Sequence, residues 1–202
     1  MLKEFNVNQI NEIAECLSNG EIVAFPTDTV FGLACVYDDE KAIQKIKDAK
    51  GRDAHKPLPM MCSNLAMIDK VAKISEDAYK IMVEHFPGAL TVILNKREEV
   101  PAYVTNGFDT IAIRIPDYKM ILEIIETIGK PLLVTSANIS NEPSIKEYQE
   151  VKKKLGERID AIVREDAYSE TSSTIVNLTD GFKILRVGEI SEATLLATLN
   201  HN

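Results

Sequence analysis

The residues best suited to bind an anion lie in a short basic segment near the end of the first quarter of the chain. Basic side chains outnumber acidic ones there, at Lys41, Lys45, Lys47, Lys50, Arg52 and Lys56. The last three stand in the run KGRDAHKP, where Gly51 and Pro57 interrupt any helix. Two cations flanking a glycine let charged side chains and backbone amides approach one phosphate together. The pattern predicts an anion site, although a solvated helix face explains the lysines before Lys50 equally well.

A second group of polar side chains follows the first buried strand, in the run PTDTVFGL. Two hydroxyls and a carboxylate come directly after the strand, from Thr27, Asp28 and Thr29. Polar residues at strand ends are where α/β proteins commonly bind ligands. A capped turn is an equally good interpretation of these residues taken alone.

Two further polar runs follow strands in the second half of the chain. Thr135 begins the run TSANIS, in which Ser136 and Asn138 would point to the same side if the chain stayed extended. An Asn-containing turn or helix cap accounts for the same residues. Ser173 opens a later strand and Arg186 ends the next one. A guanidinium in that place could stack on a base, hold a phosphate or form a surface ion pair.

Several well-known catalytic motifs are absent from the sequence. The chain lacks G-x-x-x-x-G-K-[ST], G-x-S-x-G, and G-x-G-x-x-G after its first strand. A P-loop NTPase, an α/β hydrolase and a Rossmann dehydrogenase are therefore disfavoured. The isolated cysteines and histidines are Cys16, Cys35, Cys62, His55, His85 and His201. Their scatter predicts no metal site and no catalytic histidine, although His55 lies inside the basic run.

Composition is typical of one globular domain, which we expect to span residues 1–202. The 202 residues are 45% hydrophobic, enough for a sizeable core. No apolar run is long enough to span a membrane, and the acidic, amphipathic start is unlike a signal peptide. We therefore expect a cytoplasmic protein without membrane contact. The net charge of -8 disfavours a protein whose main task is coating nucleic acid.

Helices and short strands alternate along the chain, which predicts an α/β (α+β) domain around a mixed sheet. Helical spacing of apolar residues predicts helices over roughly 9–19, 40–50, 63–72, 75–86, 117–128 and 145–155, and from 191 onward. The expected strands are IVAF, LPMMC, ALTVILN, TIAIRIP, PLLVTSA, AIV, STIVNL and KILRV. Asn8 and Asp39 are expected to cap the first two helices, the second of which leads to Lys50.

Taken in order, these segments resemble the YrdC-like family, whose synthases make threonylcarbamoyl-AMP. The likeness runs from about residue 8 to residue 190, and six modest motifs in the right order make it specific. They are GEIVAFPTDTVFGLAC, KGR with Lys56-Pro57, FPGALT, IAIRIP, TSANIS, and SST with LRVG. The differences are small: Phe86 and Ala89 stand where relatives often have Trp and a second Pro, and NEPS replaces a common glycine.

The resemblance implies a twisted mixed sheet flanked by helices around a large electropositive cavity. In the family, the patterns K-x-R and S-x-N form a nucleotide-binding tetrad. The corresponding residues, implied to be catalytic, are Lys50, Arg52, Ser136 and Asn138. The further ATP contacts implied are Lys56, Thr110, Ser144 and Arg186, and the threonine contacts implied are Thr29, Arg114 and Ser173. Few residues follow Gly188, so we expect the short form without an additional C-terminal domain.

The activity implied by the resemblance is that of a nucleotidyltransferase. It would form threonylcarbamoyl-AMP and pyrophosphate from L-threonine, bicarbonate and ATP with Mg²⁺, and separate proteins would transfer the group to adenosine in tRNA. Direct contact with tRNA or double-stranded RNA is a further expectation. Two alternatives stay open: an RNA-binding module without catalysis, and a paralogue acting on another carbamoyl acceptor, as in hydrogenase maturation. Acidic net charge argues against the first, and the lack of acylphosphatase-like and zinc-binding segments argues against the second.

Overall fold

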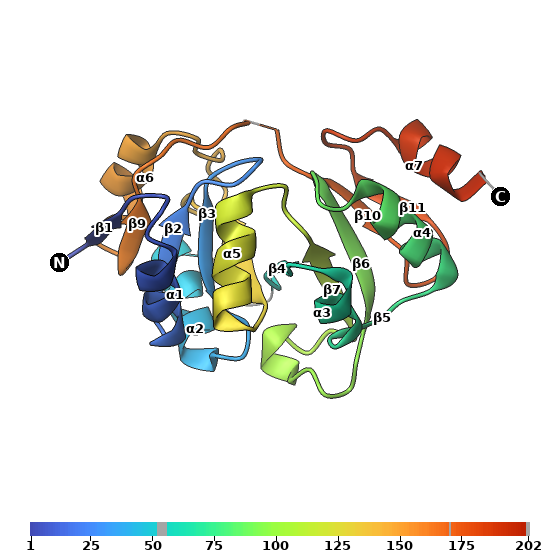
Figure 1. Cartoon of the computed structure of the whole chain (residues 1–202), viewed down its shortest axis with the longest axis horizontal. Coiled ribbons are helices and arrows are strands. Elements are labelled where there is room, and N and C mark those ends of the chain that lie inside the picture. Colours follow the sequence, from blue (N-terminus) through green and yellow to red (C-terminus); the bar gives the residue numbers. More distant parts are fainter. Residues whose placement is uncertain (52–55, 170, 201–202) are drawn as a thin grey trace.

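The centre of the molecule is one mixed β-sheet. The computed structural model describes residues 1–51, 56–169 and 171–200. Its strands are β1 (Lys3–Phe5), β2 (Val23–Phe25), β3 (Gly32–Val36), β4 (Met60–Met61), β5 (Ala72–Lys73), β6 (Leu90–Lys96), β7 (Thr110–Arg114), β8 (Leu132–Ser136), β9 (Ala161–Val163), β10 (Thr174–Asn177) and β11 (Lys183–Arg186). The strand order is β1-β9-β2-β3-β8-β4-β7-β6-β10-β11, and β5 pairs with β6 (Figure 1).

Helices flank this sheet, as predicted. They are α1 (Ile10–Ser18), α2 (Glu40–Lys50), α3 (Leu65–Asp69), α4 (Glu76–His85), α5 (Lys119–Ile128), α6 (Tyr148–Leu155) and α7 (Glu192–Asn200), with a 3₁₀ turn η1 (Ala102–Val104). The sheet contains parallel pairs such as β6 with β10 and antiparallel pairs such as β6 with β7. The predicted mixed sheet is therefore confirmed. Within the described residues, no helix has the length and apolar character needed to cross a membrane.

The two faces of the sheet are covered unequally. Helices α2, α3, α4, α6 and α7 belong to a large core on one face, which includes Ile113 and Val92. On the other face, α1 and α5 pack over β2, β3 and β8 with residues such as Phe25 and Ile121. Among the described residues, this second core includes none from β6, β7 or β10. Successive strand residues point to opposite faces, so every second residue of these strands faces an area that no helix covers.

Local sequence explains how the second helix ends at Lys50. The Asp39 carboxylate accepts a hydrogen bond of 2.9 Å from the Ala42 N–H, which confirms the predicted cap. Gly51 takes the left-handed conformation with φ of 58°, which ends the helix. The predicted Asn8 cap of α1 is wrong. Gln9 occupies that position, and its side chain accepts a hydrogen bond from the Asn6 N–H instead.

Three strands and one helix end differ from the prediction. Strands β1, β3 and β5 were not predicted from the sequence. Of these, β1 has three residues and β5 has two. The predicted helix over 63–72 ends at Asp69. Its last residues leave the helix because Ala72 and Lys73 pair with the end of β6, opposite Lys96 and Asn95. Tertiary pairing here overrides local helix propensity.

Close backbone packing at Gly188 provides a test of the fold. A Cβ atom there would lie 2.6 Å from both the Ser173 carbonyl carbon and the Thr174 nitrogen, and against the Ser172 oxygen. We expect Gly188→Ala to lower the free energy of unfolding by about 1–3 kcal/mol, measured by urea denaturation. The matched control is Val187→Ala, whose side chain is exposed and should change stability by less than about 0.5 kcal/mol. Equal stability of both variants would contradict this packing.

Candidate functional site

A cavity of about 390 Å³ lies on the uncovered part of the sheet. Its apolar floor comes from strands β4, β6, β7, β8, β10 and β11, through Met61, Ile93, Ala112, Val134, Ile175 and Leu185. Its polar lining includes Thr27, Thr29, Thr91, Arg114, Ser136, Ser144, Ser173 and Arg186. Larger hollows of about 770 and 720 Å³ lie elsewhere, but neither contains a predicted site residue. The size suits a small ligand, since such pockets usually measure about 300–1,000 Å³.

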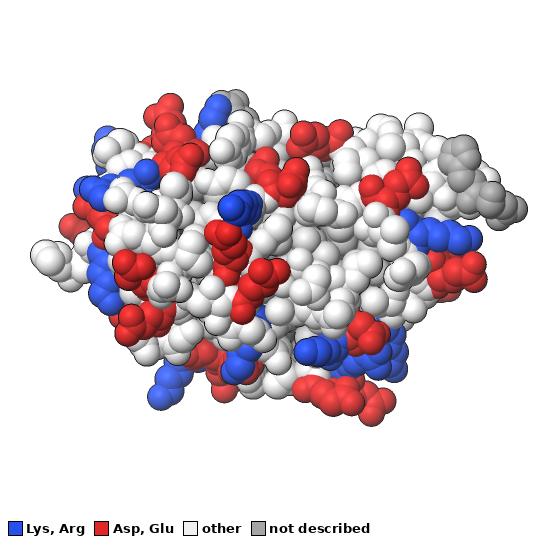
Figure 2. Space-filling view, viewed as in Figure 1, with Lys and Arg blue, Asp and Glu red and all other residues white. Residues whose placement is uncertain are grey.

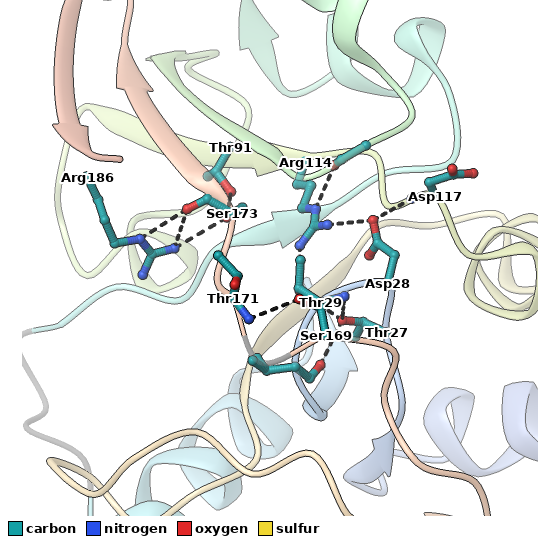
Figure 3. A network of polar contacts seen from close by, with 12 residues as sticks. Thr27, Asp28, Thr29, Thr91, Arg114, Asp117, Ser169, Thr171, Ser173 and Arg186 are labelled. Carbon is teal, nitrogen blue, oxygen red and sulfur yellow. Dashed lines mark hydrogen bonds and ion pairs between the residues drawn. The ribbon is translucent and has the colours of Figure 1, made fainter. Parts of the chain in front are cut away.

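Arg114, at the end of β7, ties three separate segments together beside this cavity (Figure 3). Its Nε donates to the Gly88 carbonyl at 2.9 Å and its Nη1 to the Thr29 hydroxyl at 2.9 Å. Its Nη2 donates to the Asp28 carboxylate at 2.6 Å. The side chain is only 5% exposed, so these partners hold a buried charge in one orientation.

The turn between β2 and β3 presents hydroxyls to the same cavity. Thr27 Oγ1 accepts from the Thr29 N–H at 3.0 Å and donates to the Val30 carbonyl at 2.7 Å. The Thr29 carbonyl accepts from the Ser169 N–H, which links the turn to the segment after β9. These bonds confirm the turn interpretation of PTDT, and the binding role of its hydroxyls stays a prediction. The turn fixes the hydroxyls that line the cavity.

A second guanidinium lies across the cavity from this turn. Arg186 ends β11, and its Nε and Nη2 donate to the Ser173 carbonyl at 3.1 and 2.8 Å. The Ser173 hydroxyl lies 2.7 Å from Thr91 Oγ1 on β6, and 3.3 Å from Arg186 Nη2 (Figure 3). The predicted group Thr29, Arg114, Ser173 and Arg186 thus surrounds one space.

The electrostatics of the cavity favour an anion. Burial lowers the pKa of Arg114, while Asp28 acts in the opposite direction and the charge of Arg186 lowers it further. Burial also lowers the pKa of Arg186. Both guanidinium groups remain charged at neutral pH, because a guanidinium is too strong a base to lose its proton there. The described lining contains no carboxylate, so the two guanidinium groups are its only charged groups, and Asp28 pairs with Arg114 from outside the lining.

Lys50 lies beneath the TSANIS loop and is not part of the cavity lining. Its side chain is buried, and its Nζ donates to the carbonyls of Ser136 and Asn138, the latter at 2.7 Å, and to Asn138 Oδ1 at 3.2 Å. The chain turns directly after β8, because the Asn138 N–H bonds to the Ser136 carbonyl. Ser136 therefore reaches the cavity, whereas the Asn138 amide nitrogen donates to the carbonyls of Ile139 and Glu142.

The other residues of the expected site differ in whether they line the cavity. Thr110 begins β7, four residues and roughly 14 Å along the strand from Arg114. Lys56 is exposed, and Pro57, which follows it, does line the cavity. Arg52 and His55 lie outside the described residues. Ser144 lines the cavity, close to the bond between the Phe31 N–H and the Ile145 carbonyl.

Two functional features escaped the sequence interpretation. The motif FPGALT supplies both the Gly88 carbonyl on Arg114 and the Thr91 hydroxyl on Ser173. Thr91 is the one polar residue among the first four buried positions of β6. A polar side chain in an otherwise apolar buried strand needs a hydrogen-bond partner, and this could have marked it as a candidate site residue. The apolar floor gave no such signal, because nearly continuous apolar runs are expected in any strand covered on both faces.

The described residues provide neither a metal site nor a reactive thiol at the cavity. No three His, Cys, Asp or Glu side chains of the described part are placed to hold a metal ion. Cys16, Cys35 and Cys62 are buried and free, and burial raises the pKa of each thiol. Figure 2 shows acidic and basic side chains interspersed on the visible face, rather than a continuous basic area among the described residues.

Comparison with known proteins gives consistent matches. Residues 15–188 match the family described as "Telomere recombination", which groups Sua5, YciO and YrdC. A threonylcarbamoyl-AMP synthase of Pyrococcus abyssi is 36% identical over 174 residues, which are 85% of this chain and 51% of the relative. A threonylcarbamoyl-AMP synthase of Vibrio campbellii is 30% identical over 186 residues, covering 90% of this chain and 100% of the relative.

The fold agrees with a solved structure of the same group. The crystal structure of P. abyssi Sua5 complexed with L-threonine superposes with a TM-score of 0.92 at 31% identity, covering 98% of this chain and 61% of that one. The chain spans about half the length of the P. abyssi synthase that it matches in sequence. From the matched residues, the sequence identity and the fold together, the chain belongs to the Sua5/YciO/YrdC family.

Proposed function

We propose that the chain is a threonylcarbamoyl-AMP synthase. The observation that carries the proposal is the placement of Arg114 and Thr29 on one side of the cavity and of Arg186 and Ser173 on the other. One guanidinium can bind an amino-acid carboxylate while the other is available to a phosphate. The relatives named as synthases and the threonine complex of P. abyssi Sua5 support this assignment.

The proposed reaction needs no protein nucleophile. Bicarbonate takes up a proton and loses water to give CO₂, and the threonine amine adds to the carbon of CO₂ and releases a proton, which yields N-carboxythreonine. A carboxylate oxygen of that carbamate attacks the α-phosphorus of ATP, the bond to the β-phosphate oxygen breaks, and pyrophosphate leaves with the electron pair. The described lining offers hydroxyls and guanidinium groups but no Cys, His or carboxylate. Catalysis therefore depends on holding the reactants together and neutralising phosphate charge.

Each part of the lining has a role in this proposal. Arg114, Thr29 and Ser173 hold threonine, while Arg186, Ser136 and Ser144 contact ATP. The apolar floor around Ile93, Ile175 and Leu185 accepts the flat, weakly hydrated base. Lys50 and Asn138 act from below by holding the loop that carries Ser136. Lys56 and Thr110, which lie apart from the cavity lining, remain proposed ATP contacts, as does Arg52, which lies outside the described residues.

Magnesium, partners and location extend the proposal. The described residues do not fit a bound Mg²⁺, so ATP phosphates would be its ligands, and no step here depends on it. The product, a reactive mixed anhydride, would pass to separate proteins that transfer the threonylcarbamoyl group to tRNA. We place the reaction in the cytoplasm, where ATP, bicarbonate and tRNA are available together.

Pyrophosphate release from ATP tests the proposed activity. We expect release by the purified chain to require both threonine and bicarbonate, because the carbamate is the attacking group. The measurement compares the full mixture with mixtures lacking either substrate. Release that ignores threonine would contradict the proposal and indicate another carbamoyl acceptor. No release, combined with salt-sensitive RNA binding, would indicate a binding module instead.

Lys50→Met tests the role of the loop beneath the cavity. Loss of the buried ammonium leaves the carbonyls of Ser136 and Asn138 without their cation. We expect the rate of pyrophosphate release to fall about a hundredfold, equivalent to roughly 3 kcal/mol. The matched control is Lys47→Met, one turn earlier on α2, where Lys47 contacts Asn106. A Lys50→Met variant with nearly wild-type rates would refute this role, and thermal melting checks that both variants are folded.

A further inference from the structure

Asp28 lies behind Arg114, on the side away from the cavity. Its Oδ2 accepts hydrogen bonds from Arg114 Nη2 at 2.6 Å and from the Asp117 N–H at 2.9 Å. It does not line the 390 Å³ cavity but borders a separate hollow of about 620 Å³, together with Asp117 and Tyr118. In Figure 3, Ser173 and Arg186 lie on the opposite side of the guanidinium from Asp28. Asp28 is therefore placed to act on a ligand only through Arg114.

The hydrogen bonds of Arg114 leave two N–H groups for a ligand. A guanidinium carries five N–H donors. Three of them bind Gly88, Thr29 and Asp28, one from each nitrogen. Among the described residues, no acceptor bonds to the remaining N–H of Nη1 or of Nη2. Such N–H groups of a charged guanidinium are the donors that bind carboxylate oxygens most strongly.

The ion pair also explains how a charge can persist in this place. Arg114 is 5% exposed and Asp28 is 13% exposed, so both groups have lost most of their water. Burial alone lowers the pKa of Arg114, and Asp28 is the first of the groups that oppose this effect. The Asp117 N–H anchors the same carboxylate oxygen, which links the turn after β2 to the segment after β7.

We propose that Asp28 is a positioning residue that fixes the Arg114 guanidinium so that its two remaining N–H groups receive the α-carboxylate of the amino-acid substrate. This inference rests on the proposed function. Charge alone would give the opposite effect: Asp28 would weaken threonine binding, because a nearby anion reduces the attraction of Arg114 for another anion. Position decides between them: Asp28 holds one edge of the guanidinium and lies outside the space that the ligand enters.

The test compares threonine with threonine amide, which lacks the carboxylate charge, in wild type, Asp28→Ala and Asp28→Asn. Calorimetry measures binding of each ligand, and kinetics measure KM for threonine and for ATP. In wild type, the amide should bind far more weakly than threonine. In Asp28→Ala, we expect threonine to bind at least tenfold more weakly and the preference for threonine over its amide to shrink by a similar factor, with KM for ATP nearly unchanged.

A merely structural role would give another pattern. Loss of stability alone would change the melting temperature or both KM values and leave the preference for the carboxylate intact, which would overturn the inference. Tighter threonine binding in Asp28→Asn would also overturn it, by showing that Asp28 competes with the ligand. The matched control is Asp38→Ala, which removes a carboxylate ion-paired with Lys130 at 2.7 Å on the surface. This variant should keep both the wild-type preference for threonine over its amide and the wild-type KM for ATP.

The outcome is separable from that of the proposed function. Wild type that binds threonine through Asp28-dependent carboxylate recognition, but releases no pyrophosphate, would contradict the synthase and support the positioning role. Wild type that makes pyrophosphate, with an unchanged carboxylate preference in both Asp28 variants, would retain the synthase and reject the positioning role. A wild-type chain that binds no threonine would overturn both.

Discussion

The buried charge of Arg114 is the constraint on which the site depends. A guanidinium removed from water needs a charged partner and hydrogen-bond acceptors to hold it, and breaking a buried ion pair typically costs about 3–5 kcal/mol. Its partners come from the turn after β2, from the Gly88 segment before β6, and, through Asp28, from the segment after β7. Bonding this one charge brings these distant segments together, and their meeting point is one wall of the cavity. The wall of the cavity and the fold therefore depend on the same set of contacts.

Helices and strands could be predicted from the sequence only where buried residues recur with a helix or strand period. Apolar spacing together with cap and stop residues predicted helices α1 to α7 but not the 3₁₀ turn η1, and the Asp39 cap was correct because a carboxylate can bond to the free N–H groups of a helix start. The short strands β1 and β5 could not be predicted, because two or three residues carry no period and their pairing depends on β9 and β6. The uncovered face over β6, β7 and β10 depends on where α1 and α5 end, which sequence alone does not specify.

The positions of site residues could be predicted where the polar residue lies within a regular strand, whose backbone stays extended. Arg114 and Arg186 end strands, and their placement beside one cavity follows from the sheet order. The S-x-N pattern was less informative, because its prediction assumed an extended chain. The chain turns after Ser136, so Ser136 reaches the cavity while Asn138 and Lys50 hold the loop. Only the three-dimensional hydrogen bonding separates contact residues from supporting ones.

The location of the ligand is the central claim, and amide and guanidinium chemical shifts measured during a threonine titration test it most directly. The shifts of Thr29, Ser173 and the Arg114 Nε–H should change together and saturate with one dissociation constant. The shifts around Lys152–Asp160, beside the larger hollow of about 770 Å³, should stay unchanged. Saturable changes confined to Lys152–Asp160, with no change at Arg114, would contradict the account.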